Sequence, residues 1–161
     1  MGTIRIIDYR PEHQQYFEKF NRNWIEKYFV MEPVDEFVLT NPDEALLKPG
    51  GAVLMAEYNG EIAGTVALRK IDERTYEFTK MAVDEQFRRK GIAEALSYAS
   101  FEKARQLGAE KVILYSNSVL KPAITLYEKL GFKHLATFVG EYKRSDVKME
   151  ILVSETIPVN H

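Results

Sequence analysis

The asparagine–glycine pair Asn59-Gly60 constrains the fold more than any other feature, because it separates two apolar runs of strand character. These runs cover residues 52–58 and 61–70. A two-residue type I′ turn needs a positive φ angle at both positions, which Asn and Gly tolerate well. A second polar turn leads into another strand-like run, residues 75–83, so the three runs are predicted to form an antiparallel meander.

The part of the chain after this meander alternates helix and strand patterns. A helix is predicted over residues 91–107, because apolar residues recur on one side and Gly108 follows at the position of a helix-ending glycine. Residues 111–115 are short, β-branched and apolar, which is typical of a buried strand. A second helix is expected over residues 122–131. The last two strand candidates are residues 134–139 and 148–153.

The segment before the meander is predicted to begin with a strand over residues 3–8. Pro11 then opens a helical stretch, since proline is tolerated in a first helical turn. Residues 32–51 are polar and contain proline. Their acidic part, residues 32–44, is interpreted as a solvated loop, which could alternatively attract a cationic amine. Together the elements predict an α+β fold with a mostly antiparallel sheet. The helical stretch carries an aromatic stripe interpreted as core, formed by Phe17, Phe20, Trp24 and Tyr28.

Length and composition exclude several classes of protein. The 161 residues fit a single domain, residues 1–161. A formal net charge of -2 argues against nucleic-acid binding, since neutralising phosphates needs a basic face. No apolar run approaches the ~20 residues of a membrane span, and the first residues lack the apolar core of a signal peptide. The absence of cysteine excludes a cysteinyl intermediate and fits a reducing cytoplasm, which is the expected location.

Metal and serine-hydrolase chemistry find no support in the sequence. His13, His134 and His161 share no helix or hairpin spacing, whereas a zinc site needs three or four converging ligands. A Gly-x-Ser-x-Gly motif is also missing. No metal is therefore expected.

The segment Arg88-Arg89-Lys90-Gly91-Ile92-Ala93 stands between a predicted strand and a predicted helix. The first turn of a helix has free N–H groups and about half a positive charge, so it binds anions. Small residues at 91 and 93 let a phosphate approach the backbone, and three adjacent cations attract it. The loop is therefore predicted to bind a pyrophosphate, with a solvated basic turn as the alternative. It matches neither the P-loop nor the Rossmann glycine pattern.

The same loop resembles a family signature. Arg88-x-x-Gly91-x-Ala93 is similar to the Arg/Gln-x-x-Gly-x-Gly/Ala motif of the GCN5-related N-acetyltransferase (GNAT) superfamily. The stretch KMAVDEQFRRKGIAEAL resembles the strand, pyrophosphate loop and helix of that family in order, and Asn117 followed by PAITLYEKLGF resembles its second cofactor motif. The resemblance spans residues 75–132. It implies the GNAT acyl-CoA N-acyltransferase fold, a three-layer α/β/α arrangement with a mixed, twisted sheet whose central strands splay apart.

In this family acetyl-CoA lies between the splayed strands, which the resemblance places at residues 75–83 and 111–115. The first strand would pair through its backbone with pantetheine, because an extended amide chain can mimic a neighbouring strand. Asn117 would hydrogen-bond the pantetheine arm, with a local turn bond as the structural alternative. Acetyl-CoA is therefore the expected cosubstrate. The implied cofactor-binding residues are Met81, Ala82, Val83, Arg88, Arg89, Lys90, Gly91, Ile92, Ala93 and Asn117.

The resemblance implies that the hydroxyl of Tyr127 faces the sulfur of coenzyme A. A thiol has a pKa of ~8.5 and a tyrosine a pKa of ~10, so full proton transfer to the thiolate is uphill by about 2 kcal/mol. A hydrogen bond that stabilises the departing thiolate is the safer assignment. Packing of the ring under the final strands is the structural alternative.

Glu77 is the candidate general base, since some family members place a catalytic glutamate at the same offset on this strand. An amine of pKa ~10.4 is rarely neutral at pH 7, whereas an α-amine of pKa ~7.8 needs less help. A glutamate at its ordinary pKa of ~4.3 would be a weak base unless burial raised that value. An ion pair with Lys80, Arg69 or Arg74 is the equally weighted alternative.

The implied function is N-acetyl transfer from acetyl-CoA to a primary amine by direct, sequential attack, and the backbone N–H groups of residues 81–83 could polarise the thioester carbonyl. The acceptor stays open among a polyamine, an amino acid, an antibiotic, a peptide N-terminus and a lysine. In this family the first helices often wall the acceptor site, so Trp24 or Tyr28 could touch it. Dimers are frequent in the family, which leaves a homodimer open.

The stretches NRNWIEKYF-x-MEP and KPGG also resemble the acetyltransferase half of bacterial proteins that carry a MarR-type regulator in front. The chain has no room for that regulator, so a bacterial stand-alone version is expected. Two other classes stay open, namely a sensor that binds acetyl-CoA without turnover and a purely structural domain with this fold. Coenzyme A binding without any acetylation would indicate the sensor, and a lack of coenzyme A binding would indicate the structural domain.

Overall fold

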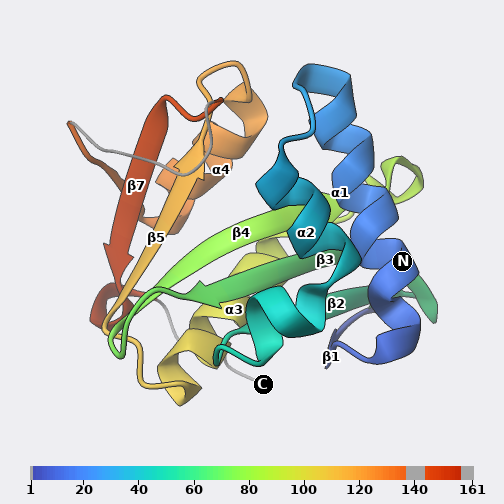
Figure 1. The fold of residues 1–161 in the computed structure, drawn as a ribbon, viewed down its shortest axis with the longest axis horizontal. Helices are drawn as coiled ribbons and strands as arrows, with labels where there is room; N and C mark the ends of the chain where they lie inside the picture. The colour runs from blue at the N-terminus through green and yellow to red at the C-terminus, as the bar shows by residue number, and fades with distance from the viewer. Residues whose placement is uncertain (1, 137–143, 157–161) are drawn as a thin grey trace.

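A seven-stranded sheet runs through the centre of the computed structural model, which describes residues 2–136 and 144–156 (Figure 1). The strand order is β1-β2-β3-β4-β5-β7-β6, with β4 and β5 parallel and the other neighbours antiparallel. The expected mixed, mostly antiparallel sheet is therefore confirmed. The strands are β1 (Ile4–Asp8), β2 (Ala52–Tyr58), β3 (Glu61–Lys70), β4 (Thr75–Val83), β5 (Lys111–Ser116), β6 (Lys133–His134) and β7 (Val147–Leu152).

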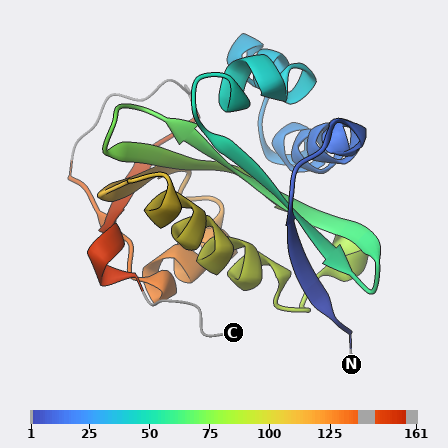
Figure 2. The ribbon, with the colours of Figure 1, turned by 90° about the horizontal axis from the view of Figure 1, so that it is seen from below.

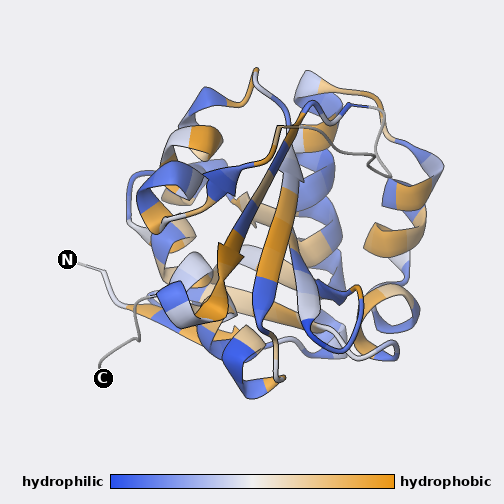
Figure 3. Cartoon of the chain, turned by 90° about the vertical axis from the view of Figure 1, so that its left-hand side faces the viewer, coloured by the Kyte–Doolittle hydropathy of each residue, from blue (hydrophilic) through white to orange (hydrophobic). Residues whose placement is uncertain are grey.

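Helices cover both faces of the sheet, which confirms the three-layer arrangement (Figure 2). One face carries α1 (Gln14–Tyr28) and α2 (Pro33–Thr40), and the other carries α3 (Ile92–Gln106) and α4 (Lys121–Leu130). Hydrophobic and hydrophilic residues alternate along these helices, so each turns an apolar side to the sheet (Figure 3). Two buried apolar clusters result, one beneath α3 and one beneath α1 and α2. No helix within the described ranges is long and apolar enough to cross a membrane.

The Asn59-Gly60 turn closes the hairpin of β2 and β3 as its sequence predicts. Both residues have positive φ angles, 51° for Asn59 and 85° for Gly60, as a type I′ turn requires. Tyr58 pairs with Glu61 directly across the turn. This short connection fixes the register of the meander on which the rest of the sheet is built.

The prediction of a solvated loop over residues 32–44 is wrong. This stretch contains α2 and the start of a π-helical turn, η2 (Asp43–Leu47), and the side chains of Leu39 and Leu46 from these two elements are buried in the core. A local signal for α2 was present. Pro33 stands in the first turn, and the carboxylate of Asp35 accepts the backbone N–H of Glu32 at 3.0 Å, as in a helix-capping interaction.

The predicted strand over residues 134–139 is described only in part. β6 covers Lys133–His134 and pairs with β7, and residues 137–139 lie outside the described residues. The 3-10 turn Pro11–His13 leads into α1, in agreement with the helical stretch expected from Pro11.

Candidate active site

The parallel pair β4 and β5 separates part-way along its length. Only three residue pairs join the two strands, from Thr75 opposite Lys111 to Glu77 opposite Ile113. Beyond Glu77, β4 continues for six residues, to Val83, without pairing to β5. The expected splay of the central strands is thus observed, and it exposes backbone N–H and C=O groups at a strand edge.

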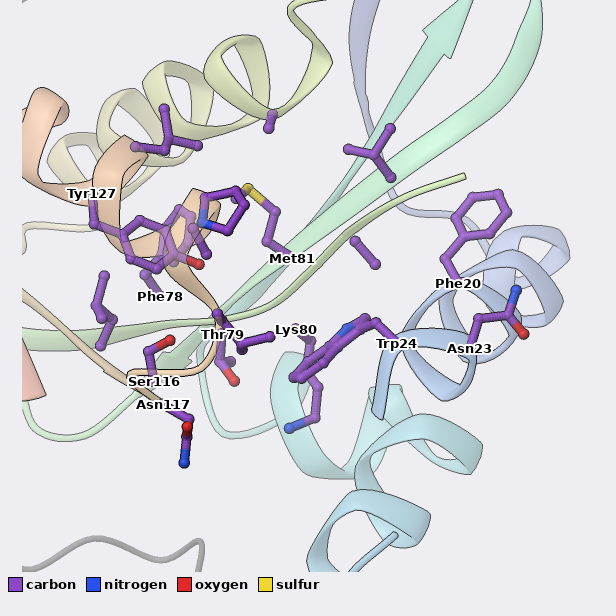
Figure 4. A pocket seen from close by; sticks show the side chains of 18 of the residues that line it. Phe20, Asn23, Trp24, Phe78, Thr79, Lys80, Met81, Ser116, Asn117 and Tyr127 are labelled. Atoms are coloured by element: carbon purple, nitrogen blue, oxygen red, sulfur yellow. The ribbon is translucent and has the colours of Figure 1, made fainter. Parts of the chain in front are cut away.

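A cavity of about 360 Å³ lies in this opening (Figure 4). Tyr127 and Phe78 lie at one end of it, and Trp24, Asn23 and Phe20 of α1 lie at the other. Of the residues singled out from the sequence, the cavity wall contains Met81, Ala82, Val83, Arg88, Ala93, Asn117 and Tyr127. The fold therefore gathers most of the expected cofactor residues, from three separate segments, around one space.

A β-bulge shapes the β4 side of this cavity. Ala67 pairs with Thr79 and Thr65 pairs with Ala82, so Lys80 and Met81 together oppose the single residue Val66. Lys80 has a φ angle of 55°, a left-handed conformation that costs a non-glycine residue about 1–2 kcal/mol. The surrounding structure must hold this geometry, and the bulge re-aims the strand next to the cavity.

The N-terminus of α3 is the part of the site where the sequence predicts a pyrophosphate. Gly91 caps the helix with a φ angle of 82°, which favours glycine. A Cβ atom at Gly91 would meet no other atom within 4 Å, so the space above this backbone is open to a ligand. The first N–H groups of the 15-residue helix lack intrahelical acceptors, and its dipole favours an anion here. These features fit a pyrophosphate.

The cations of this loop point in different directions. Arg88 lines the cavity and lies 3.6 Å from Glu85. The ammonium of Lys90 instead lies over the ring of Tyr58, 5.8 Å from the ring centroid. Arg89 has a left-handed backbone conformation and is absent from the cavity wall. Ile92 is 1% exposed and packs in the core. The structure thus brings only Arg88, of the three adjacent cations, to the cavity.

Tyr127 reaches the cavity from α4 and is enclosed by aromatic rings. Its ring centroid lies 5.7 Å from that of Phe78 and 6.0 Å from that of Phe132, both in edge-to-face geometry. Burial raises the pKa of Tyr127 to about 12. Its phenol is therefore neutral near pH 7 and able to donate a hydrogen bond.

Asn117 lines the cavity at the end of β5, but its side chain also makes structural bonds. Its Oδ1 accepts the backbone N–H of Val119 at 2.9 Å, which is the local turn bond weighed as the alternative. Its Nδ2 donates to the backbone carbonyl of Arg144 at 2.5 Å. Asn117 therefore links the end of β5 to the segment before β7.

Glu77 does not line the cavity. Its side chain is 1% exposed, and its Oε1 accepts a hydrogen bond from Nε of Arg69 at 2.9 Å on the neighbouring strand. Of the two hypotheses for this residue, the geometry favours the cross-strand ion pair over the general base.

A buried group of four charges, here called the Asp35 cluster, was not found from the sequence. Asp35 is 0% exposed and accepts two hydrogen bonds from Arg144, at 2.7 and 2.9 Å. The ammonium of Lys80 lies 3.3 Å from Asp35, and Arg144 also donates to Glu32 at 3.1 Å. The cluster joins α2, the β4 bulge and the segment before β7.

These contacts set the ionisation of the central carboxylate. Burial alone would raise the pKa of Asp35, but the hydrogen bonds from Arg144, the charge of Lys80 and the N–H of Glu32 outweigh it, so the pKa is lowered. Asp35 is therefore ionised at neutral pH, and a carboxylate held in this way is a poor base.

The residues of the aromatic stripe on α1 lie in different environments. Phe17 is fully buried in the core, whereas Phe20 and Trp24 line the cavity and Tyr28 is exposed. The indole N–H of Trp24 donates to Asn21 at 3.0 Å, which fixes the ring. The interpretation of the stripe as core is thus confirmed for Phe17 and Phe20, which are 0% and 4% exposed, and Trp24 lies in the cavity wall.

No group of three or more His, Asp or Glu side chains that could hold a metal occurs within residues 2–136 and 144–156. His13 is buried and its Nδ1 accepts the backbone N–H of Arg10. His134 is exposed and bonds to Glu128, and His161 lies outside the described residues.

Two parted parallel strands, a glycine-capped helix at their open end and helices on both faces define the acyl-CoA N-acyltransferase fold. Comparison with known proteins supports this assignment of the fold. The chain belongs to the acetyltransferase (GNAT) family, whose model matches residues 8–132. The family membership expected from the motifs is therefore confirmed.

Individual relatives cover different shares of the chain. The N-acetyltransferase YjgM of Escherichia coli, itself uncharacterized, is 32% identical over 108 residues, which are 65% of each chain. The N-acetylaspartate synthetase of Homo sapiens is 40% identical over 88 residues, but these are 54% of this chain and 29% of the relative. In fold, yncA of Salmonella typhimurium, solved with its cofactor acetyl-CoA, superimposes with a TM-score of 0.74 at 21% identity, covering 94% of this chain and 95% of the other.

The Asp35 cluster predicts a large effect on stability. Asp35→Ala removes the carboxylate that Lys80 and Arg144 share in a buried setting, so we expect the free energy of unfolding to fall by about 3–5 kcal/mol. Urea unfolding at pH 7 measures this change in the free energy of unfolding. The control is Glu36→Ala on the same helix, which removes an exposed carboxylate paired with Arg22 and should cost much less. Equal losses for the two variants would contradict the role of the cluster.

The same carboxylate predicts a pH dependence. Because its pKa is lower in the folded than in the unfolded chain, its contribution is complete above the ordinary aspartate value of ~3.9 and declines as the pH falls below that value. The difference in stability between the wild-type protein and Asp35→Ala should therefore shrink in acid. A stability difference between the two proteins that stays constant from pH 7 to pH 3 would contradict this prediction.

Proposed function

We propose that this protein is an acetyl-CoA-dependent N-acetyltransferase that acetylates a primary amine. One observation carries the proposal: the opening between β4 and β5 leads from the N-terminus of α3 to the hydroxyl-bearing ring of Tyr127 within one cavity. Family membership supports it. The cysteine-free composition supports a cytoplasmic location, and we treat residues 1–161 as one acetyltransferase domain.

The residues present fit acetyl-CoA. The first N–H groups of α3, together with Arg88, would hold the pyrophosphate, and the open space above Gly91 leaves room for it. The unpaired edge of β4 at residues 81–83 would hydrogen-bond pantetheine as an added strand does. Bound acetyl-CoA supplies a thioester whose acetyl group moves to the amine nitrogen, while the C–S bond breaks and its electron pair leaves with sulfur.

Tyr127 stabilises the negative charge that develops on the leaving sulfur. With a tyrosine pKa of about 12 and a thiol pKa of ~8.5, full proton transfer from the phenol is uphill by more than three pKa units. The phenol therefore acts as a hydrogen-bond donor that stays protonated, and the thiolate takes its proton from water. The edge-to-face packing on Phe78 and Phe132 holds the ring in place for this role.

The acceptor amine must lose its proton before or during attack. Glu77 is held by Arg69 outside the cavity wall, and Asp35 is held by Arg144 and Lys80. We propose that water carries the proton away and that Glu77 stabilises the sheet. The acceptor in this mechanism is an amine that is readily deprotonated at neutral pH.

Coenzyme A binding tests the cofactor site. We expect a saturable heat when coenzyme A is titrated into the protein in a calorimeter, and Arg88→Ala should weaken the affinity about tenfold because a charged phosphate contact is lost. Arg74→Ala is the matched control, since Arg74 is an exposed arginine near β4 that is absent from the cavity wall. An absence of heat from protein without trapped ligand would overturn the proposed function.

Tyr127→Phe tests the leaving-group role. Removal of one hydrogen-bond donor to developing charge should lower kcat about 10²-fold in a thiol-release assay, with the affinity for coenzyme A little changed. Tyr16→Phe on the outer side of α1 is the control and should leave kcat unchanged. Wild-type kcat in Tyr127→Phe would show that the ring serves packing alone.

Glu77→Gln separates the two hypotheses for that residue. Because the carboxylate pairs with Arg69, we expect a lower melting temperature and a kcat/KM whose dependence on pH matches that of the wild-type enzyme. Loss of the acidic limb of the pH profile, with the fold intact, would instead identify Glu77 as the base.

A further inference from the structure

The wall at the α1 end of the cavity contains two cationic side chains, and the carboxylates that pair with them lie outside that wall. Lys80 and Arg144 both line the cavity, whereas Asp35 and Glu32, which neutralise them, are absent from its wall. In the close-up, Lys80 and Trp24 lie side by side, away from Tyr127 (Figure 4). The side chain of Arg144 is 11% exposed and that of Lys80 is 2% exposed, so Arg144 is the cation of this wall that an acceptor can reach.

Arg144 is fixed in place on several sides. Its guanidinium makes two parallel hydrogen bonds to Asp35, and its central carbon lies 5.8 Å from the ring centroids of both Trp24 and Phe29. Its backbone carbonyl accepts the side-chain N–H of Asn117 at the end of β5. A guanidinium held this firmly loses little entropy when an anion binds it. Its fork is occupied by Asp35, so a ligand carboxylate would approach from the cavity side.

The remaining described residues of this wall add no negative charge. α1 contributes Phe20, Asn23, Trp24 and Lys27, followed by Phe29. The described carboxylates in the cavity wall are Asp84 and Glu85, and both lie on the loop that leads to the phosphate end. Glu85 lies 3.8 Å from Lys27 and 3.6 Å from Arg88, so its charge is matched there.

This distribution of charge discriminates among acceptors. A polyamine would place a second ammonium against the guanidinium of Arg144, where like charges repel. A molecule with a carboxylate beside its amine would gain a charge-assisted hydrogen bond at the same place. The aromatic rings of Trp24, Phe20 and Phe29 leave an apolar surface for the rest of such a molecule.

Resting on the proposed function, the geometry points to a free α-amino acid as the acceptor, with its carboxylate bound at the Arg144 and Lys80 wall and its amine directed toward the thioester. Binding of the carboxylate also helps the chemistry. An α-carboxylate stabilises its own neighbouring ammonium, and neutralising it with a guanidinium removes that stabilisation, so the amine is deprotonated more easily. This effect supplies part of what a general base would otherwise provide.

The first test compares matched acceptors on the wild-type enzyme. Thiol release is measured with acetyl-CoA and pairs of an amino acid and its α-amide, for aspartate, leucine and phenylalanine, beside spermidine and N-acetyl-lysine free at its side chain. We expect at least one amino acid to exceed its own amide tenfold or more in kcat/KM. Turnover confined to amides, spermidine or the lysine side chain would overturn the inference.

The second test removes the cation. Arg144→Gln should bring the ratio of amino acid to amide close to one, mainly by raising KM for the amino acid, and Arg144→Lys should restore part of the ratio. Arg22→Gln, on the outer face of α1, is the matched control and should keep the wild-type ratio. An unchanged ratio in folded Arg144→Gln would overturn the inference. If Arg144→Gln does not fold, the comparison of each amino acid with its amide on the wild-type enzyme still tests the inference.

Failure of this inference is distinguishable from failure of the proposed function. Coenzyme A binding in the calorimeter together with acetylation of amides or polyamines would leave the transferase standing and overturn only the α-amino acid. A protein that binds no coenzyme A and acetylates no amine would overturn both.

Discussion

The site depends on the short pairing of β4 with β5. Three residue pairs hold the strands together at one end, and beyond Glu77 the sheet opens instead of continuing. A sheet that ran on would satisfy its own backbone groups and leave no edge for an amide chain to join. The bulge at Lys80 and Met81 adds to this opening by bending β4, so the cavity is a consequence of sheet geometry before any side chain is considered.

The Asp35 cluster offsets the free-energy cost of the bulge at Lys80. Lys80 adopts an unfavourable backbone conformation and is buried, and a buried ammonium needs a carboxylate nearby. Asp35 supplies it from α2 and binds Arg144 at the same time, so one carboxylate ties the bulge to α2 and to the segment that carries Arg144. These four side chains therefore affect both stability and the shape of the proposed acceptor site, and a change of charge among them is expected to loosen the bulge.

The sequence correctly predicted the features that are set by residues adjacent in the chain. Asn59-Gly60 fixes a turn by its own φ angles, and Gly91 caps α3 in the same way, so the meander and the phosphate end follow from short stretches of sequence. Residues 32–44 were misread because their acidic and proline residues resemble a loop, although Pro33 and Asp35 begin a helix. Glu77 shows another limit, since its distance along the strand does not reveal which face it occupies or that Arg69 pairs with it.

The two ends of the cavity differ in how the sequence encodes them. Most of the proposed cofactor end comes from one continuous segment of β4, loop and α3, which recurs as a motif because its parts are adjacent. The proposed acceptor end combines α1, the bulge and Arg144, and Arg144 lies 109 residues from its partner Asp35. No spacing rule connects such positions, because only the folded sheet brings them together. The family can thus be predicted from the sequence alone, whereas the proposal for the amine depends on the charges around Asp35, which only the folded structure brings together.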